Sequence, residues 1–333
     1  MAIRIEIAHR NNFYSARLKG EYLALYYACI DNLSRGVLRT SARIPYAEGA
    51  HGAVREVINA IIYGCPELFF IEQQVGLAWS GEQLTLEFTS KYPQGQVAEL
   101  YRALTAEVER ISALINRCGE PFDKLNLLND YLCLRVKPVQ SFLERYGDAY
   151  GALILKEARC EGFAKAAALI LDRCGIDCVI AHGQAASRGA RISHAWVIAA
   201  VNGTHYHFDF AWNASRTVHG VVGVEYLFLG DSESGIEHFP EIAYPPCPDD
   251  SMTFWARNNS ILRYQSDLSR IKIVPARKGY LAIAKLPRKL TGYEVSHEVS
   301  GWMIKELSAY SFGRSIAYNY NEPLDLLVFY FLP

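Results

Sequence analysis

The run from Phe163 to Leu171 constrains the fold of this chain more than any other stretch. Every residue in it except Lys165 is apolar and four are alanine, so a helix formed here is apolar on all sides and must be buried. Gly175 ends this helix, because glycine adopts the left-handed conformation that follows a helix C-terminus without a Cβ clash. The pattern predicts a buried helix with Cys160 in its first turn.

A β-hairpin is predicted further along the chain. Asn202-Gly203 separates two apolar, β-prone runs, which is the strongest local signal for a two-residue type I′ turn. Pairing the residues on either side of this turn places Trp196 opposite Asp209 and His194 opposite Ala211. Because side chains alternate along a strand, His194 and Asp209 then project from one face as diagonal neighbours, roughly 7–8 Å apart at the backbone.

The three side chains that a thiol nucleophile needs therefore occur along this region. Cys160 lies where the positive end of the helix macrodipole favours the thiolate, His194 can act as the base, and Asp209 can orient the imidazole. Two other interpretations compete. A free cysteine is often a small buried hydrophobe. The cluster of His205, His207 and Asp209 shares strand parity and could form a zinc site with Cys160 or His194, although no Cys-x-x-Cys or His-x-x-x-His spacing accompanies it.

These motifs resemble the core of the transglutaminase-like superfamily, in which Cys-x-Gly-aromatic begins a helix, His-Ala-Trp lies on a strand, and an aromatic-rich strand ends in Asp. The matching motifs are Cys160-Glu161-Gly162-Phe163, His194-Ala195-Trp196 and Tyr206-His207-Phe208-Asp209, followed by Trp212. Flanking similarities to bacterial members are Leu128-Asn129-Asp130-Tyr131-Leu132, Tyr150-Gly151-Ala152-Leu153 and the segment 226–231. The resemblance covers about residues 120–250.

The resemblance implies an α+β fold with a papain/transglutaminase-like core, in which the buried helix with the cysteine packs on an antiparallel sheet that carries the histidine and the aspartate. Two positions depart from the family pattern. Members usually carry His where Asn129 stands, and Asp where Asn213 follows Trp212. Neither position belongs to the triad, but both concern the surroundings of the pocket.

Around this core we expect an N-terminal α/β extension over residues 1–118, the catalytic core over 119–250, and a small C-terminal α/β appendage over 251–333. A proline-rich segment from 240 to 248 marks the end of the core. Other expected elements are strands at 68–71, 75–79, 84–89 and 225–229, and helices at 96–116 and 294–308.

Composition excludes several classes of partner. A net charge of −1 with 21% charged residues gives no electrostatic footprint for nucleic acid or an anionic membrane. The first twelve residues lack the continuous apolar run of a signal peptide, and the longest apolar runs are too short to span a bilayer. Eight cysteines without a regular framework indicate reduced, intracellular thiols. We therefore expect a cytoplasmic protein.

Further pocket residues are predicted less directly. The backbone N–H of Cys160 is the first candidate donor to an oxyanion, and Tyr150 is the second. Trp196 and Trp212 either pack in the core or form a wall beside the cleft. No metal and no cofactor is predicted; some animal relatives use calcium, but the sequence contains no calcium loop.

The sequence predicts a cysteine-nucleophile acyl-transfer enzyme that acts on a peptide, a protein or a small amide through a thioester. Water as acceptor gives a peptidase or amidase, and an amine gives a transamidase; the sequence leaves both open. The alternative is a catalytically silent module that binds peptides or serves as a scaffold.

Overall fold

The computed structural model describes residues 4–7, 13–187, 189–263, 271–276, 278–299, 301 and 314–332. Helices and strands both occur along the chain, so the predicted α+β class is confirmed. The chain divides into two compact units, each built from separate segments. Unit 1 comprises Met1–Leu128, Val136–Ala181 and Ala195–Ala200, and unit 2 comprises Asn129–Arg135, His182–His194 and Val201–Pro333. The expected division at residues 118 and 250 stays a prediction.

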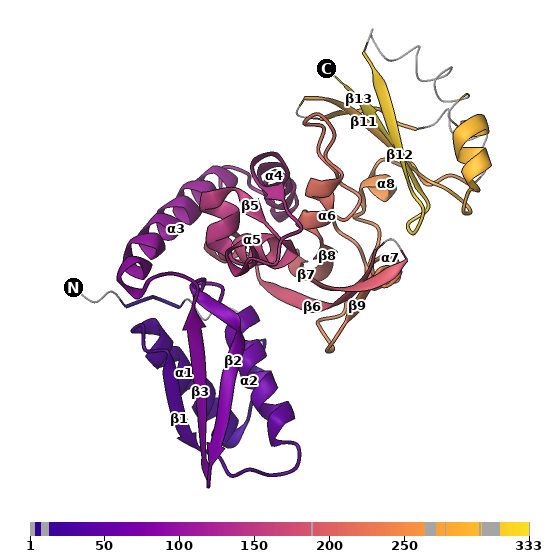
Figure 1. Cartoon of the computed structure of the whole chain (residues 1–333). Coiled ribbons are helices and arrows are strands. Elements are labelled where there is room, and N and C mark those ends of the chain that lie inside the picture. Colours follow the sequence, from indigo (N-terminus) through magenta and orange to yellow (C-terminus); the bar gives the residue numbers. More distant parts are fainter. Residues whose placement is uncertain are drawn as a thin grey trace. The chain divides into compact units, whose positions relative to one another are not determined.

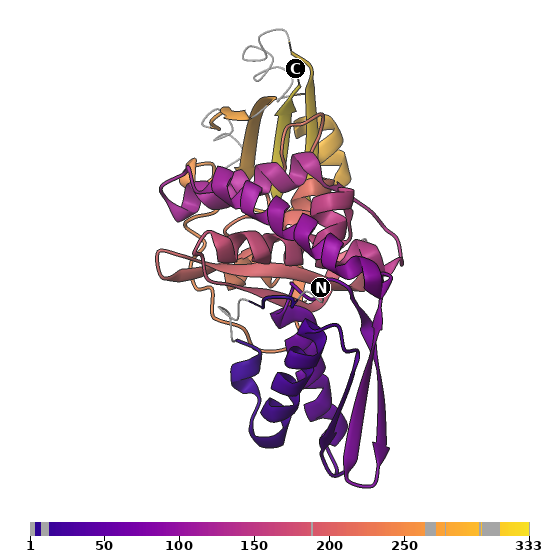
Figure 2. The same cartoon turned by 90° about the vertical axis from the view of Figure 1, so that its left-hand side faces the viewer.

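The N-terminal part of unit 1 is a three-stranded antiparallel sheet accompanied by two helices (Figures 1 and 2). The strand order is β1-β3-β2. The elements are η1 (Ser15–Arg17), α1 (Gly20–Ser34), β1 (Arg39–Arg43), α2 (Ala50–Gly64), β2 (Ile71–Ser80) and β3 (Gln83–Ser90). The expected strands at 75–79 and 84–89 are the two arms of the β2–β3 hairpin, which turns at Gly81 with φ 61°.

The separate strand expected at 68–71 is wrong. Residues 65–70 form turns, in which the Leu68 N–H donates to the Cys65 carbonyl and the Ile71 N–H donates to the Leu68 carbonyl. The strand begins only at Ile71, and a register shift precedes Val75. Leu68, Phe69 and Phe70 are nevertheless buried. This apolar run therefore indicates that the side chains are buried in the core, and not that the backbone is extended.

The rest of unit 1 is mainly helical. Its elements are α3 (Gln94–Ile115), the start of α4 (Pro121–Arg135), β4 (Lys137–Pro138), η2 (Glu144–Gly147), η3 (Gly151–Leu155), β5 (Glu157–Ala158) and α5 (Cys160–Arg173). The helix expected at 96–116 is confirmed as α3. The buried helix with Cys160 in its first turn is confirmed as α5, which packs against α3 and is followed by Gly175 with φ 71°.

The first four strands that follow α5 form a four-stranded sheet with the order β8-β7-β6-β9. Its strands are β6 (Cys178–Ser187), β7 (Ala190–Val201), β8 (Thr204–Phe208) and β9 (His238–Pro240). The two-residue turn between β7 and β8 is confirmed, because Asn202 and Gly203 have φ values of 51° and 84°. Pairing of His194 with Ala211 is wrong, since β8 ends at Phe208 and Ala211 lies in α6 (Phe210–Ser215).

The C-terminal part of unit 2 contains a second four-stranded antiparallel sheet, ordered β10-β11-β13-β12 (Figure 1). Its elements, with the short helices before it, are α7 (Asp231–Ser234), α8 (Phe254–Arg257), β10 (Val274–Ala276), β11 (Gly279–Lys285), η5 (Glu294–Val299), β12 (Ile316–Asn321) and β13 (Leu326–Phe331). Every residue of β13 is buried. Of the helix expected at 294–308, the structure describes η5 and residue 301; residues 300 and 302–308 lie outside the described residues.

The strand expected at 225–229 is wrong. These residues are buried but irregular, and Phe228 has a φ of 56°, which an extended strand does not contain. The segment instead lies beside β8 and is joined to it by isolated backbone hydrogen bonds. The Asp209 N–H donates to the Tyr226 carbonyl, and the backbones of His207 and Leu229 exchange hydrogen bonds. Among the described residues, no helix is both long and apolar enough to cross a membrane.

Candidate active site

His194 and Asp209 form a buried imidazole–carboxylate pair in unit 2. The Nε2 atom of His194 lies 2.6 Å from Oδ2 of Asp209, and the two residues are only 4% and 2% exposed. The predicted approach of these two side chains is therefore confirmed, although they come from a strand and from a helix cap rather than from two paired strands. Since an ionised carboxylate only accepts, Nε2 of His194 carries a proton in this contact.

Asp209 owes its position to the start of α6. It directly follows the last residue of β8, and its Oδ1 accepts a hydrogen bond of 3.0 Å from the Trp212 N–H, which is the usual contact of an N-cap aspartate. Both oxygens are thus fixed, one by the helix end and the other by the imidazole. The residue that orients the histidine is held by the same short stretch of sequence that turns the chain from strand to helix.

A second imidazole shares the same carboxylate oxygen. His238 in β9 is 3% exposed, and its Nε2 lies 3.1 Å from Oδ2 of Asp209. Burial raises the pKa of Asp209, but the charge and hydrogen bond of His194, together with those of His238, outweigh this and hold it below its ordinary value. Burial lowers the pKa of His238, and the bond to Asp209 opposes this only in part. The carboxylate is therefore ionised and His238 neutral near pH 7.

Aromatic rings enclose this cluster. The Trp212 ring lies 5.0 Å from the His194 ring and 4.7 Å from the His238 ring, and it meets the Tyr226 ring edge-on at 4.8 Å. Trp212 is half-buried, so part of its indole remains available beside His194. This position suits the predicted wall of a cleft.

Cys160 is the first residue of α5, and Arg159 is its N-cap. Its thiol is half-buried, as is that of Cys118, whereas the other six cysteines are buried. The sulfur lies 3.4 Å from Oε2 of Glu161, and the same carboxylate oxygen lies 3.5 Å from the Arg159 Nε. The first-turn N–H groups of a helix have no intrahelical acceptor, so donors surround this end of α5.

Gly162 allows the first turn of α5 to approach its neighbours closely. A Cβ placed at this position would lie 2.6 Å from the Tyr146 carbonyl oxygen and 3.0 Å from that of Asp148. The Cys-x-Gly spacing of the motif therefore has a steric reason. The glycine allows the segment 146–148 to lie against the second residue after the cysteine.

The two positions that depart from the family pattern contact each other. Asn213 donates from Nδ2 to Oδ1 of Asn129 over 3.1 Å, and Asn129 donates to the Gly223 carbonyl over 2.9 Å. Oδ1 of Asn213 accepts from the Tyr226 N–H at 3.0 Å, and both asparagines are buried. Two neutral amides therefore contact each other beside the start of α6.

The remaining pocket candidates lie in different surroundings. Tyr150 stacks on Phe69 at 5.6 Å and meets Tyr92 edge-on at 5.6 Å, and burial raises its pKa. Trp196 is 1% exposed, so its indole presents almost no surface to a ligand and core packing is the simpler explanation. The oxyanion role of Tyr150 and the wall role of Trp196 remain predictions.

The residues of the expected zinc alternative have separate partners. His207 Nε2 lies 3.0 Å from Oδ1 of Asp231, Asp209 bonds to the two histidines described above, and His205 is half-buried. Two groups of potential metal ligands occur in the described part of the chain: His194 with Asp209 and His238, and His207 with Asp231 and Cys247. The set of His205, His207 and Asp209 is not among them.

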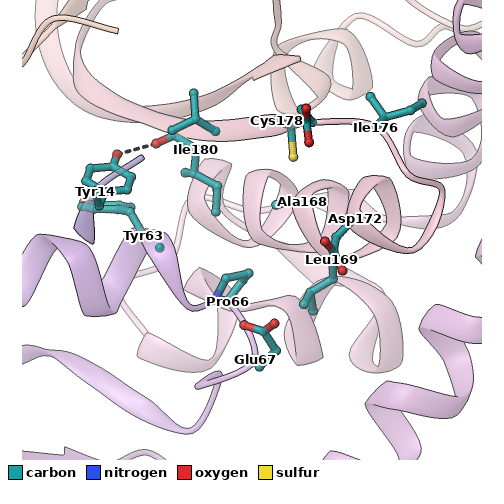
Figure 3. Close-up of a pocket in the computed structure, with 13 residues that line it drawn as sticks. Tyr14, Tyr63, Pro66, Glu67, Ala168, Leu169, Asp172, Ile176, Cys178 and Ile180 are labelled. Carbon is teal, nitrogen blue, oxygen red and sulfur yellow. Dashed lines mark hydrogen bonds between the residues drawn. The ribbon is translucent and has the colours of Figure 1, made fainter. Parts of the chain in front are cut away.

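A pocket in unit 1 lies away from Cys160. It encloses about 560 Å3 including its open mouth and is lined by Tyr14, Tyr63, Glu67 and the second half of α5, with Tyr14 donating to the Ile180 carbonyl (Figure 3). The first α5 residue that lines it is Ala168. Ala168 is eight residues beyond the nucleophile candidate, or roughly 12 Å along the helix axis.

Sequence reasoning missed His238. It lies in the segment IEHFPEI, which has neither a spacing motif nor a regular alternation. Its position follows from the pairing of β9 with β6, in which His238 lies opposite Ala185. No local signal specifies that pairing, so the sequence could not identify His238.

Together these features define a protein with a buried imidazole–carboxylate pair and a thiol at a helix start. Residues 109–210, which include Cys160, His194 and Asp209, match the family model described as the transglutaminase-like superfamily. This match confirms, over that segment, the resemblance to the transglutaminase-like superfamily seen in the sequence. A comparison with curated protein sequences gave no significant match.

Three solved structures are similar at low sequence identity. A TGase structure is 13% identical with a TM-score of 0.30, over 52% of this chain and 50% of the other. A proposed cysteine protease from Cytophaga hutchinsonii is 12% identical with a TM-score of 0.29, over 40% and 55%. A proposed protease from Parabacteroides distasonis is 11% identical with a TM-score of 0.27, over 80% and 68%. The chain thus spans about half the length of the first two structures.

Proposed function

We propose that this protein is a cysteine-dependent acyl-transfer enzyme that acts on amide bonds of peptides or proteins. Cys160 is the nucleophile, His194 is the general base and acid, and Asp209 orients the imidazole and stabilises its charged form. The observation that carries this proposal is the 2.6 Å contact between His194 Nε2 and Asp209 Oδ2, because it leaves Nδ1 of His194 as the basic atom.

The reaction proceeds through a thioester. The Cys160 sulfur attacks the carbonyl carbon while its proton passes to Nδ1 of His194, and the C–S bond forms. The tetrahedral intermediate then collapses, the C–N bond breaks, and His194 returns the proton to the leaving amine. Water or a second amine attacks the thioester, loses a proton to His194 and releases Cys160, which regains that proton.

The ionised state of Asp209 serves both half-reactions. The imidazole becomes positively charged twice in the cycle, and a carboxylate bonded to its Nε2–H stabilises that charge without taking the proton. The N–H groups at the start of α5 supply donors for the oxyanion that develops on the carbonyl oxygen. The proposal requires that the Cys160 sulfur come within hydrogen-bonding reach of Nδ1 of His194.

Selective alkylation tests the nucleophile. At pH 6, iodoacetamide should modify Cys160 at least tenfold faster than Cys118, which is the matched control because this residue is also half-buried but lies in a turn after α3. His194→Ala should reduce the Cys160 rate to that of Cys118. Equal rates for the two thiols in the wild-type protein would favour the silent scaffold.

A second assay identifies the acceptor. The protein is incubated with a glutamine-containing peptide and a tagged primary amine, and both ammonia and tagged product are measured. Incorporation of the tag, absent in Cys160→Ser, identifies a transamidase. Ammonia or peptide fragments without tag incorporation identify a hydrolase. Loss of both products in a protein whose Cys160 still reacts with iodoacetamide would restrict the enzyme to other amide substrates.

A further inference from the structure

A second group of ligand-bearing side chains lies in unit 2, apart from the imidazole–carboxylate pair of the proposed triad. His207 in β8, Asp231 at the start of α7 and Cys247 in the loop after β9 each offer one donor atom, and these atoms all lie within 4.8 Å of one another. His207 and Cys247 are buried, whereas the Asp231 side chain is 58% exposed. The group therefore has buried nitrogen and sulfur donors and one opening to solvent.

We propose that His207, Asp231 and Cys247 bind a zinc ion. Imidazole nitrogen, carboxylate oxygen and thiolate sulfur form a common donor set for Zn2+, whereas Ca2+ and Mg2+ prefer oxygen ligands alone. Water enters from the open side at Asp231 and completes four-coordination. This proposal does not depend on the acyl-transfer activity.

The spacing of the donors suits a tetrahedral site. With ordinary zinc bond lengths, the nitrogen and oxygen ligands are roughly 3.3 Å apart, and sulfur is roughly 3.6 Å from either. The His207 Nε2 and the Asp231 Oδ1 are 3.0 Å apart. The Cys247 sulfur lies within 4.8 Å of the other two ligand atoms, so a rotation of its side chain has to shorten these distances by about 1.2 Å at most.

The backbone holds these ligands in place. The Asp231 N–H donates to the Cys247 carbonyl over 2.7 Å, and the Cys247 N–H donates to Oδ2 of Asp231 over 2.8 Å. Asp250 supports the same turn, since its carboxylate accepts from the Gly230 N–H over 2.6 Å and from the Ser232 hydroxyl. Two residues that are 16 apart in sequence are thus fixed side by side before any ion arrives.

Charge favours a cation at this position. Binding displaces the thiol proton to solvent, after which the Cys247 thiolate and the Asp231 carboxylate together balance Zn2+. The nearby Asp250 carboxylate adds negative charge outside the ligand set. The group of His194, Asp209 and His238 is a weaker candidate, because it lacks a sulfur ligand and both of its rings already donate to one oxygen of Asp209.

Cobalt substitution tests the site in the full-length protein. After treatment with a chelator, one equivalent of Co2+ should produce visible bands of tetrahedral cobalt together with a near-ultraviolet thiolate-to-cobalt band. Cys247→Ser should abolish the thiolate band, and His207→Gln and Asp231→Asn should each weaken Co2+ and Zn2+ binding at least tenfold. Because Asp231 is exposed, the Asp231→Asn variant should fold normally, and thermal unfolding without metal checks this.

Matched variants decide between this site and others. His205→Gln changes an imidazole two residues away on the same strand, and Cys160→Ser removes the proposed nucleophile; both should keep one zinc per chain by elemental analysis. Zinc should raise the melting temperature of the wild-type protein but not of Asp231→Asn. Absence of a thiolate band in the wild type, its persistence in Cys247→Ser, or its loss in Cys160→Ser would overturn the proposal.

Discussion

Asp209 combines several tasks in one side chain. It caps α6 through Oδ1 and receives two imidazole Nε2–H groups on Oδ2. A buried carboxylate is costly unless its lone pairs are satisfied, and here three donors satisfy it. His238 therefore acts as a positioning residue: it fixes the carboxylate that in turn fixes His194.

We expect His238→Leu to lower the free energy of unfolding by about 2 kcal/mol, because one donor to a buried carboxylate is removed. His238→Gln retains an N–H at a similar reach and should recover most of this loss. Urea unfolding at pH 7 measures both variants. Iodoacetamide labelling of Cys160 should follow the same order, and equal behaviour of the two variants would show that only the volume of His238 matters.

The buried asparagine pair leads to a second prediction. In Asn213→Asp a carboxylate replaces the amide that donates to Asn129, so the variant should lose about 1–3 kcal/mol of stability at pH 7. A protonated carboxyl group can donate, so the loss should shrink between pH 7 and pH 4. Urea unfolding across this range measures the difference from the wild type, and a loss that is constant with pH would refute the explanation.

The relation between His194 and Asp209 was predictable because it depends on local geometry. Asn202-Gly203 fixes a tight turn, and counting outward from that turn brings the two side chains to one place. The pairing with Ala211 was wrong because the count assumed that the strand continued, whereas Asp209 begins a helix. The partners of Asn129 and the approach of His238 depend on contacts distant in sequence, for which the chain carries no local signal.

At the scale of elements, α5 is the part that the sequence predicted best. A run of small and aliphatic residues of this length favours a helix that is buried on all sides. The sequence also predicted both ends of this helix, with Cys160 in its first turn and Gly175 after its last. The apolar runs at 68–71 and 225–229 gave strand predictions that the structure contradicts. Both runs are buried, but burial alone does not determine whether a short apolar segment is extended or turned.

Gly162 gives a prediction at this scale. A Cβ at this position would press against two backbone carbonyls that cannot move aside, so Gly162→Ala should cost about 1–3 kcal/mol of stability. The matched control is Gly52→Ala in α2, where nothing lies within 4 Å of the added atom. That variant should gain up to about 1 kcal/mol. Thermal unfolding compares them, and a stabilised Gly162→Ala would contradict the close approach.

At the scale of the whole molecule, one buried lysine contributes to the dependence of stability on pH. Burial lowers the pKa of Lys165 to about 8, and the nearby charge of Lys91 adds to the effect. The unfolded chain binds this proton up to about pH 10.5, so between pH 8 and 10.5 the unfolded state holds more protons. The Lys165 contribution to stability therefore rises with pH through this window, and its full cost is present below pH 8.

Lys165→Met should consequently stabilise the protein at pH 7, by about 3 kcal/mol at most, and much less at pH 10. The comparison with the wild type is needed because buried thiols make stability fall as pH rises. Cys178 is an example, since burial raises its pKa to about 12. Lys289→Met on the surface serves as the control. Urea unfolding at the two pH values provides the test, and a difference that does not change with pH would contradict the lysine assignment.

Both compact units are assembled from interleaved segments, and this has a consequence for how the chain is made. Unit 1 needs Ala195–Ala200 as well as the first 128 residues, so it cannot be completed while the ribosome is still adding the intervening stretch. At typical synthesis rates that interval lasts roughly 4–14 s. Helix α5 is synthesised within this interval, whereas His194 must await Asp209 and His238, which follow later in the chain.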